Sequence, residues 1–219
     1  MMMKKRNRRF LIFGLLILLS AAGSCTEPSL SQKGYQALEA GNTQEGIFYL
    51  KEYLQKNPMD TKGRNNLAVA YLRQAHYDQA FKELQKVIAQ DPKDATAHYN
   101  LALVYYYKKL FDEEIQEYRK TIALAPSHYG AHLNLGHALL GKGQKKEAIQ
   151  QYQWVIEKDP ENGKVFYTLG ALFMDLTESE KAISMFKRYL ELDPEGKFSK
   201  QAHAFLDKLN KKNFPHEKP

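Results

Sequence analysis

The sequence has few of the features that are typical of disulfide-bonded, membrane-spanning or catalytic proteins. Cys25 is the only cysteine among 219 residues, so no disulfide can form within the chain. The most apolar run covers residues 10–19, about half of the ~20 residues that a helix needs to cross a bilayer. No motif pairs a nucleophile with a base. The sequence therefore predicts neither a disulfide scaffold nor an enzyme, and it predicts no cofactor.

Positive charge is concentrated at the start of the chain. The formal net charge is +7, and five of these charges come from Lys4, Lys5, Arg6, Arg8 and Arg9. The rest of the chain carries only +2, so we expect no nucleic-acid partner. The proportions of hydrophobic and charged residues, 43% and 26%, are those of an ordinary globular protein.

A basic run, an apolar run and a group of small residues follow one another over residues 1–24. This order is typical of a secretory signal peptide, which we expect these residues to form. A retained membrane helix is the less favoured interpretation, because the apolar run is short.

Cys25 directly follows the small residues 22–24. The segment resembles the lipobox of bacterial lipoproteins, in which the cysteine is acylated and becomes the mature N-terminus. That resemblance implies a lipid-anchored protein on the periplasmic side of the bacterial cell envelope, with residues 25–29 as a tether. Thr26 in place of Asp implies the outer membrane more than the inner one. Ala22 departs from the usual Leu, and the same residues also fit ordinary signal cleavage, which would leave a plain thiol.

Five prolines recur at an interval of 34 residues: Pro58, Pro92, Pro126, Pro160 and Pro194. Because proline stops a helix, a stop at every 34th residue marks the end of a repeated unit. Counting each proline as position 32 gives five units, which span 27–60, 61–94, 95–128, 129–162 and 163–196.

Residue types also repeat inside these units. Position 8 is small in every unit, and position 24 is large and apolar. The residues at position 8 are Gly34, Ala68, Ala102, Gly136 and Gly170, and those at position 24 are Leu50, Leu84, Tyr118, Tyr152 and Phe186. The pattern resembles the tetratricopeptide repeat, although Lys33 stands where unit one should have Leu. The resemblance implies an all-α fold, an α-solenoid of about five helix-turn-helix repeats.

Both ends of the array need a cap, because a stack of repeats exposes apolar surface at its ends. Unit one is expected to be the polar-faced N-terminal repeat. After Pro194, an amphipathic helix over residues 197–210 is expected to cap the C-terminal end, and residues 211–219 are expected to form a frayed tail.

Three consecutive tyrosines in unit three cannot share one helix face, because successive residues point about 100° apart. Tyr105 is at position 11 and faces inward, whereas Tyr106 and Tyr107 are at positions 12 and 13. In the resembled family, positions 2, 5, 6, 9, 12 and 13 line the concave surface of the superhelix. The peptide-binding residues predicted there are Asn66, Asn100, Asn134, Tyr99, Tyr106, Tyr107, His137 and Tyr167. For aliphatic residues of this set, such as Leu103, packing against the next repeat is an equal alternative.

Asn66, Asn100 and Asn134 all stand at position 6. A carboxamide both donates and accepts hydrogen bonds, so spaced asparagines can bind the main chain of an extended peptide. The array resembles the asparagine ladder of O-linked N-acetylglucosamine transferases. Asparagine is also common at this position across the family, which leaves simple family habit as the alternative.

Two further motifs are expected to be structural. The segment from Gly141 to Lys146 lacks the spacing of a phosphate-binding loop and is expected to be the turn of unit four. His128 and His132 have no third ligand nearby, so no metal site is predicted. His98 and His132 share position 4, where a buried or half-buried structural role is expected.

Together these features predict a membrane-tethered scaffold that binds a peptide or helix of a protein partner in its concave groove. Among repeat-containing lipoproteins the chain resembles the pilotins of type IV pilus secretins, which implies a role in assembling an envelope complex. The alternative is an accessory subunit of an envelope enzyme, such as a hydrolase or glycosyltransferase.

Overall fold

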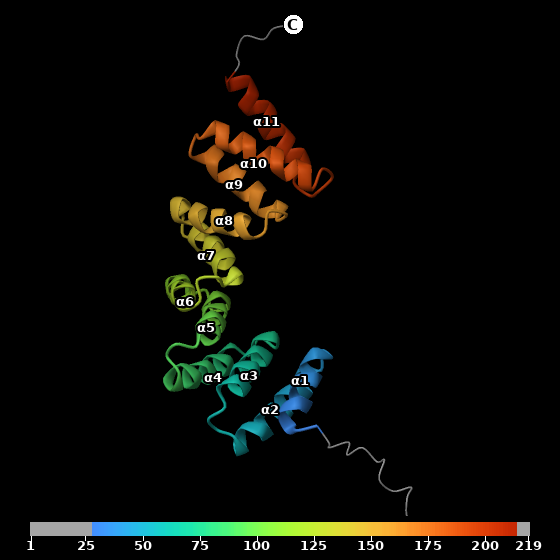
Figure 1. The fold of residues 1–219 in the computed structure, drawn as a ribbon, viewed down its shortest axis with the longest axis vertical. Helices are drawn as coiled ribbons and strands as arrows, with labels where there is room; N and C mark the ends of the chain where they lie inside the picture. Colours follow the sequence, from blue (N-terminus) through green and yellow to red (C-terminus); the bar gives the residue numbers. More distant parts are fainter. Residues whose placement is uncertain (1–27, 214–219) are drawn as a thin grey trace, which may run out of the picture.

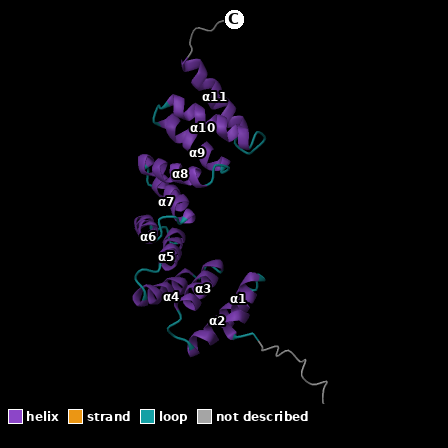
Figure 2. Ribbon diagram, in the orientation of Figure 1, coloured by secondary structure: helices purple, strands orange, loops and turns teal. Residues whose placement is uncertain are grey.

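The computed structural model describes residues 28–213, with side chains through residue 209, and every regular element in that range is a helix. The helices follow one another along an elongated stack (Figure 1), with no strand in the described range (Figure 2). They are α1 (Leu30–Glu39), α2 (Thr43–Lys56), α3 (Thr61–Arg73), α4 (Tyr77–Gln90), α5 (Ala95–Tyr107), α6 (Phe111–Leu124), α7 (Tyr129–Gly141), α8 (Lys145–Lys158), α9 (Gly163–Asp175), α10 (Ser179–Leu192) and α11 (Ser199–Asn213). The predicted all-α solenoid of five helix pairs and a capping helix is confirmed.

The predicted signal peptide and Cys25 lie outside the described residues, as does the end of the chain from residue 214 onward. Among the helices that the structure does describe, none combines the length and apolar character of a membrane span.

Each periodic proline lies in the loop between one helix pair and the next helix. The second helix of each unit ends two residues before the proline, and its C-cap residue directly precedes the proline, which cannot continue the helix. The first helix of the next unit then begins directly after an N-cap residue, whose side chain accepts a hydrogen bond from the N–H three residues further on. These capping residues are Asp60, Asp94, His128 and Asn162.

The turn between the two helices of a unit has one fixed backbone feature. Position 15 has a positive φ, between 57° and 82°, in all five units. The residues there are Gly41, Ala75, Lys109, Gly143 and Thr177. The segment from Gly141 to Lys146 therefore contains the turn of unit four, which covers residues 142–144 between the end of α7 and the start of α8. Where the residue is not glycine, the left-handed conformation costs on the order of 1 kcal/mol, which the packing of the two helices offsets.

The two helices of each unit pack through positions 8 and 24. All five residues at position 24 are at most 1% exposed. A Cβ added at Gly136 would lie 2.7 Å from Tyr152 Cε1, and one added at Gly170 would lie 2.7 Å from Phe186 Cε1. Position 8 is small because the large side chain at position 24 occupies the space beside it.

The C-terminal cap is built by contacts that begin before α11. Phe198 N–H donates to the Tyr189 hydroxyl at 3.1 Å, and the Ser199 hydroxyl donates to the Asp193 carbonyl at 2.8 Å. Ala202 and Leu209 are buried against the last repeat. The helix begins two residues after the predicted start at 197 and runs three residues past 210, into the predicted tail, because no glycine or proline stops it before Pro215.

Candidate functional site

Tyr106 and Tyr107, at the end of α5, are exposed as expected, at 52% and 50%. Their surroundings differ. The Tyr107 ring stacks on Tyr77 of α4, with centroids 5.0 Å apart and planes 8° apart. Tyr106 contacts Tyr107 edge-on, with centroids 5.2 Å apart. Tyr107 is therefore partly engaged between repeats, and Tyr106 is the tyrosine of the three that keeps the most surface for a partner.

Two of the three asparagines at position 6 bind the neighbouring repeat. Asn100 is only 6% exposed, and its Nδ2 lies 3.5 Å from Asn65 Oδ1. Asn134 Nδ2 donates to the Tyr99 hydroxyl at 3.2 Å. Each bond joins position 6 of one unit to position 5 of the unit before it. These two amides link the first helices of neighbouring units, a contact that the spacing of the asparagines does not predict. Their binding to a peptide stays a prediction.

Asn66 differs from the other two asparagines. It is half-buried, and among the described residues it makes no hydrogen bond. Asn65, one residue earlier, takes the structural role instead, because its Nδ2 donates to Asp94 Oδ2 at 3.0 Å. Of the predicted ladder, Asn66 is the member whose carboxamide remains available to an incoming main chain.

Tyr99 lies in a crowded place between units three and four. Its ring centroid is 4.5 Å from that of His128 and 5.8 Å from that of Tyr118. A Cβ added at Gly130 would lie 3.0 Å from the Tyr99 hydroxyl, so the close approach of α7 depends on that glycine. Burial raises the pKa of the Tyr99 hydroxyl, and the bond from Asn134 opposes this.

Tyr167 and His137 differ in their exposure, because Tyr167 is half-buried and His137 is exposed. The Tyr167 ring stacks on Phe198 with centroids 4.5 Å apart, and its hydroxyl donates to Gln201 Oε1 at 3.0 Å. The C-terminal cap therefore covers this end of the face. His137 keeps part of its surface exposed, but its ring lies 5.6 Å from that of Tyr152, and burial lowers the pKa of the imidazole.

Glu114 is a buried acid within unit three. It is 3% exposed, and its Oε2 has no hydrogen-bond partner among the described residues. Burial raises the pKa of this carboxyl to about 7. The other units have a small residue at this position, position 20, and a Cβ added at Gly46 in unit one would lie 2.5 Å from Leu38 Cδ2. Leu38 stands at position 12 of unit one, the position that Tyr106 holds in unit three.

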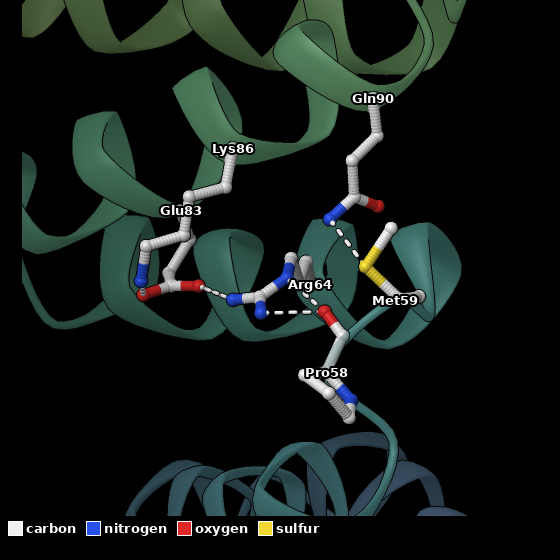
Figure 3. Close-up of polar contacts among 6 residues, drawn as sticks. All are labelled: Pro58, Met59, Arg64, Glu83, Lys86 and Gln90. Atoms are coloured by element: carbon white, nitrogen blue, oxygen red, sulfur yellow. Dashed lines mark hydrogen bonds and ion pairs between the residues drawn. The ribbon is translucent and has the colours of Figure 1, made fainter.

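A repeated polar contact, which we call the latch, joins positions 4 and 23 within a unit. In unit two, Arg64 Nη1 donates to Glu83 Oε2 at 2.6 Å, and Arg64 Nη2 donates to the Pro58 carbonyl at 2.6 Å (Figure 3). Lys86 also pairs with Glu83, at 2.7 Å. Nearby, Gln90 Nε2 donates to Met59 Sδ at 3.7 Å, so the loop before α3 contacts α4 directly through Met59 and indirectly through Arg64 (Figure 3).

The same latch explains the two histidines at position 4. His98 Nδ1 lies 2.6 Å from Glu117 Oε2, and Nε2 lies 3.0 Å from the Pro92 carbonyl. His132 makes the equivalent contacts with Gln151, at 2.8 Å, and with the Pro126 carbonyl, at 3.0 Å. Both histidines are buried, as expected for a structural role. The described residues hold no group of three side chains that could bind a metal ion.

The family model described as tetratricopeptide repeat matches residues 65–129 and 133–197, together more than half of the chain. A search of curated proteins finds no match.

Several solved structures resemble the chain. The crystal structure of the MamA protein is 21% identical, with a TM-score of 0.67, over 76% of this chain and 91% of that one. MamA from Desulfovibrio magneticus RS-1 is 24% identical, with a TM-score of 0.67, over 75% and 93%. YrrB, described as a repeat protein of this kind with an unusual peptide-binding site, is 16% identical, with a TM-score of 0.67, over 80% and 90%. At these identities the likeness is one of fold.

Proposed function

Because the chain belongs to the tetratricopeptide repeat family, we propose that it is a non-enzymatic scaffold that binds a peptide or helix of a partner protein. The exposed aromatic surface of unit three is the observation that carries this proposal. Tyr106 and Tyr107 are about half exposed, and Leu110 and Phe111 follow at 38% and 46%. Large apolar side chains gathered on one surface are typical of an interaction site.

The chemistry of the surface supports a peptide more than a small molecule. Asn66 offers an unpaired carboxamide to a main chain, and Tyr106 offers a ring and a hydroxyl. The solved structure of YrrB is described as having a peptide-binding site, which supports this class of ligand for a fold of this kind.

A capture experiment tests the proposal. Full-length protein is crosslinked in cells, purified in detergent, and its partners are identified by mass spectrometry. We expect Asn66→Ala combined with Tyr106→Ala to lower recovery of a bound partner by about tenfold or more, because both groups face the ligand and neither holds the fold.

The matched control is Phe48→Ala, which removes an apolar side chain that is 59% exposed on α2 of unit one. It should leave partner recovery unchanged. If the double variant, the control and the wild type recover the same partners, the proposed binding surface is wrong.

We further propose that the scaffold is tethered to a bacterial membrane through Cys25 and that it serves in assembling an envelope complex, such as a pilus or secretion system. The leader over residues 1–24 and the cysteine that follows it support this proposal. Two or more acyl chains on one cysteine would make release from the membrane negligible.

Cys25→Ser tests the tether. We expect the protein to move from the membrane fraction to the soluble fraction and to lose the mass of its acyl chains. The wild type should stay in the membrane fraction after high-salt washing, because acyl chains do not depend on charge. A wild-type protein that is recovered in the soluble fraction without acyl chains would contradict the tether and leave the scaffold proposal intact.

A further inference from the structure

Neighbouring units meet through a contact that recurs at a spacing of 30 residues. Position 13 of one unit lies against position 17 of the unit before it. Between units two and three, this contact is the stack of Tyr107 on Tyr77, with planes 8° apart. Between units four and five, it is an ion pair, with Lys145 Nζ 2.9 Å from Asp175 Oδ2. At both junctions the two side chains are chemically matched.

A second contact beside the first one shows that the junctions have the same geometry. Position 14 of one unit pairs with position 18 of the unit before it. Lys108 pairs with Asp78 between units two and three, at 2.5 Å, and Lys142 pairs with Asp112 between units three and four, at 3.0 Å. The helices at these two junctions therefore approach each other in the same way.

At the junction of units three and four, one half of the first contact is missing. Position 17 is Phe111, whose ring is 46% exposed, but position 13 is Gly141. A Cβ added at Gly141 would meet no heavy atom within 4 Å. The place that the Tyr107 ring occupies above Tyr77 is therefore open above Phe111. Leu110, 38% exposed, extends the apolar surface.

The charges around Phe111 are uneven. Asp78 and Asp112 are already paired with Lys108 and Lys142. Lys109, two residues before Phe111, is exposed and has no ion pair among the described residues. Glu113 is two residues after Phe111 on α6, so it points to the opposite side of the helix. Glu114, three residues after Phe111, is only 3% exposed, so it does not contribute to the surface. The exposed, unpaired charge in the turn that leads to Phe111 is thus positive.

We propose that Phe111 and the space above Gly141 form a binding subsite for an aromatic side chain that a partner protein presents within an acidic segment. The partner's ring stacks on Phe111 as Tyr107 stacks on Tyr77, and its acidic neighbours face Lys109. The subsite rests on the proposed scaffold function and defines the chemistry of the segment that this surface selects.

Titration of the full-length, isotope-labelled protein in detergent micelles with short peptides tests the subsite by nuclear magnetic resonance. The probe is a seven-residue peptide of Asp and Glu with a central Trp. One control peptide has Ala in place of Trp, and another has Lys in place of the acids. We expect the amide signals of Phe111 and Gly141 to shift with the probe, and both control peptides to bind about tenfold or more weakly.

Three variants complete the experiment. Gly141→Tyr supplies the missing ring from within the chain, and Phe111→Ala removes the ring below; each should weaken binding of the probe by about tenfold or more. Gly141→Ala adds only a Cβ in open space, so it should bind like the wild type. Because Gly141→Tyr recreates the contact of Tyr107 with Tyr77, its melting temperature should not fall, which separates a blocked site from a damaged fold.

Several outcomes would overturn the inference. Equal binding of the probe to all variants would show that the ring is not held at Phe111, and equal binding of the Ala peptide would reduce the site to charge alone. The wild type could instead self-associate without binding the probe, and Phe111→Ala could abolish that self-association. This result would show that a second copy of the chain occupies the space above Phe111. Another outcome is that partners are still captured through Asn66 and Tyr106 while the probe fails to bind. That result would contradict the subsite and leave the proposed scaffold function intact.

Discussion

In unit three, positions 4 and 23 hold His98 and Glu117, whereas in unit five the same two positions hold Phe166 and Met185. His98 and Glu117 form a buried latch with an N–O distance of 2.6 Å, and Phe166 and Met185 belong to the apolar core. Both solutions occur within the same stack. These positions therefore demand a given volume and shape, and the fold accepts either polarity when the polar groups are paired.

Unit three departs from unit five at position 20 as well. Glu114 is buried there without a partner for its Oε2, whereas unit five has the fully buried Ala182. Unit three also exposes the aromatic surface on which we base the proposed function. The unit with the most buried polar groups is thus the one that presents the candidate site, as expected where binding and stability compete.

The largest effect is expected from breaking the latch of unit three. Glu117→Ala removes the acceptor of His98 Nδ1 and should lower the free energy of unfolding by about 2–3 kcal/mol. Glu117→Gln is the control, because unit four already pairs His132 with Gln151 at 2.8 Å. It should recover most of the loss. Urea unfolding followed by circular dichroism measures both. A Gln variant as unstable as the Ala variant would show that the two latches are not equivalent.

A smaller, pH-dependent effect is expected at Glu114. Its pKa in the folded state is raised to about 7 from the ordinary value of 4.5, because burial disfavours the charged form. The neutral carboxyl therefore favours folding at pH 4, and this contribution is lost as the pH rises through about 7. Glu114→Ala, the residue found in unit five, should raise the free energy of unfolding at pH 8 by about 1–2 kcal/mol.

The pH dependence provides the control for this effect. The gain from Glu114→Ala should shrink as the pH falls from 8 to 4.5, and thermal unfolding of the two proteins at several pH values would measure it. A gain that stays constant over this range would mean that the side chain's volume, and not its ionisation, sets the cost.

Much of the fold could be predicted from residue types alone. The proline interval gave the unit boundaries, and the small residues at position 8 predicted the close approach to position 24. The positive φ at position 15 could not be predicted, because Ala75, Lys109 and Thr177 do not favour that conformation. The latch was missed as well, since its three groups come from separate elements and each is an ordinary polar residue.

The candidate site was less predictable. The helical wheel predicted that Tyr106 is exposed. It did not predict that Asn100 is buried or that Phe198 stacks on Tyr167. A wheel describes one helix, whereas these contacts form between units.

The sequence by itself determined the repeat, the helix ends and the residues that each helix turns inward, because proline, capping groups and apolar periodicity act over a few neighbouring residues. Only the tertiary structure decided which side chains already contact a neighbouring repeat and which places remain open to a partner. Asn100 is bound to Asn65, Tyr107 is stacked on Tyr77, and the space above Gly141 is open. Each of these facts depends on the distance between side chains that lie about 30 residues apart, and stacking of whole repeats sets that distance.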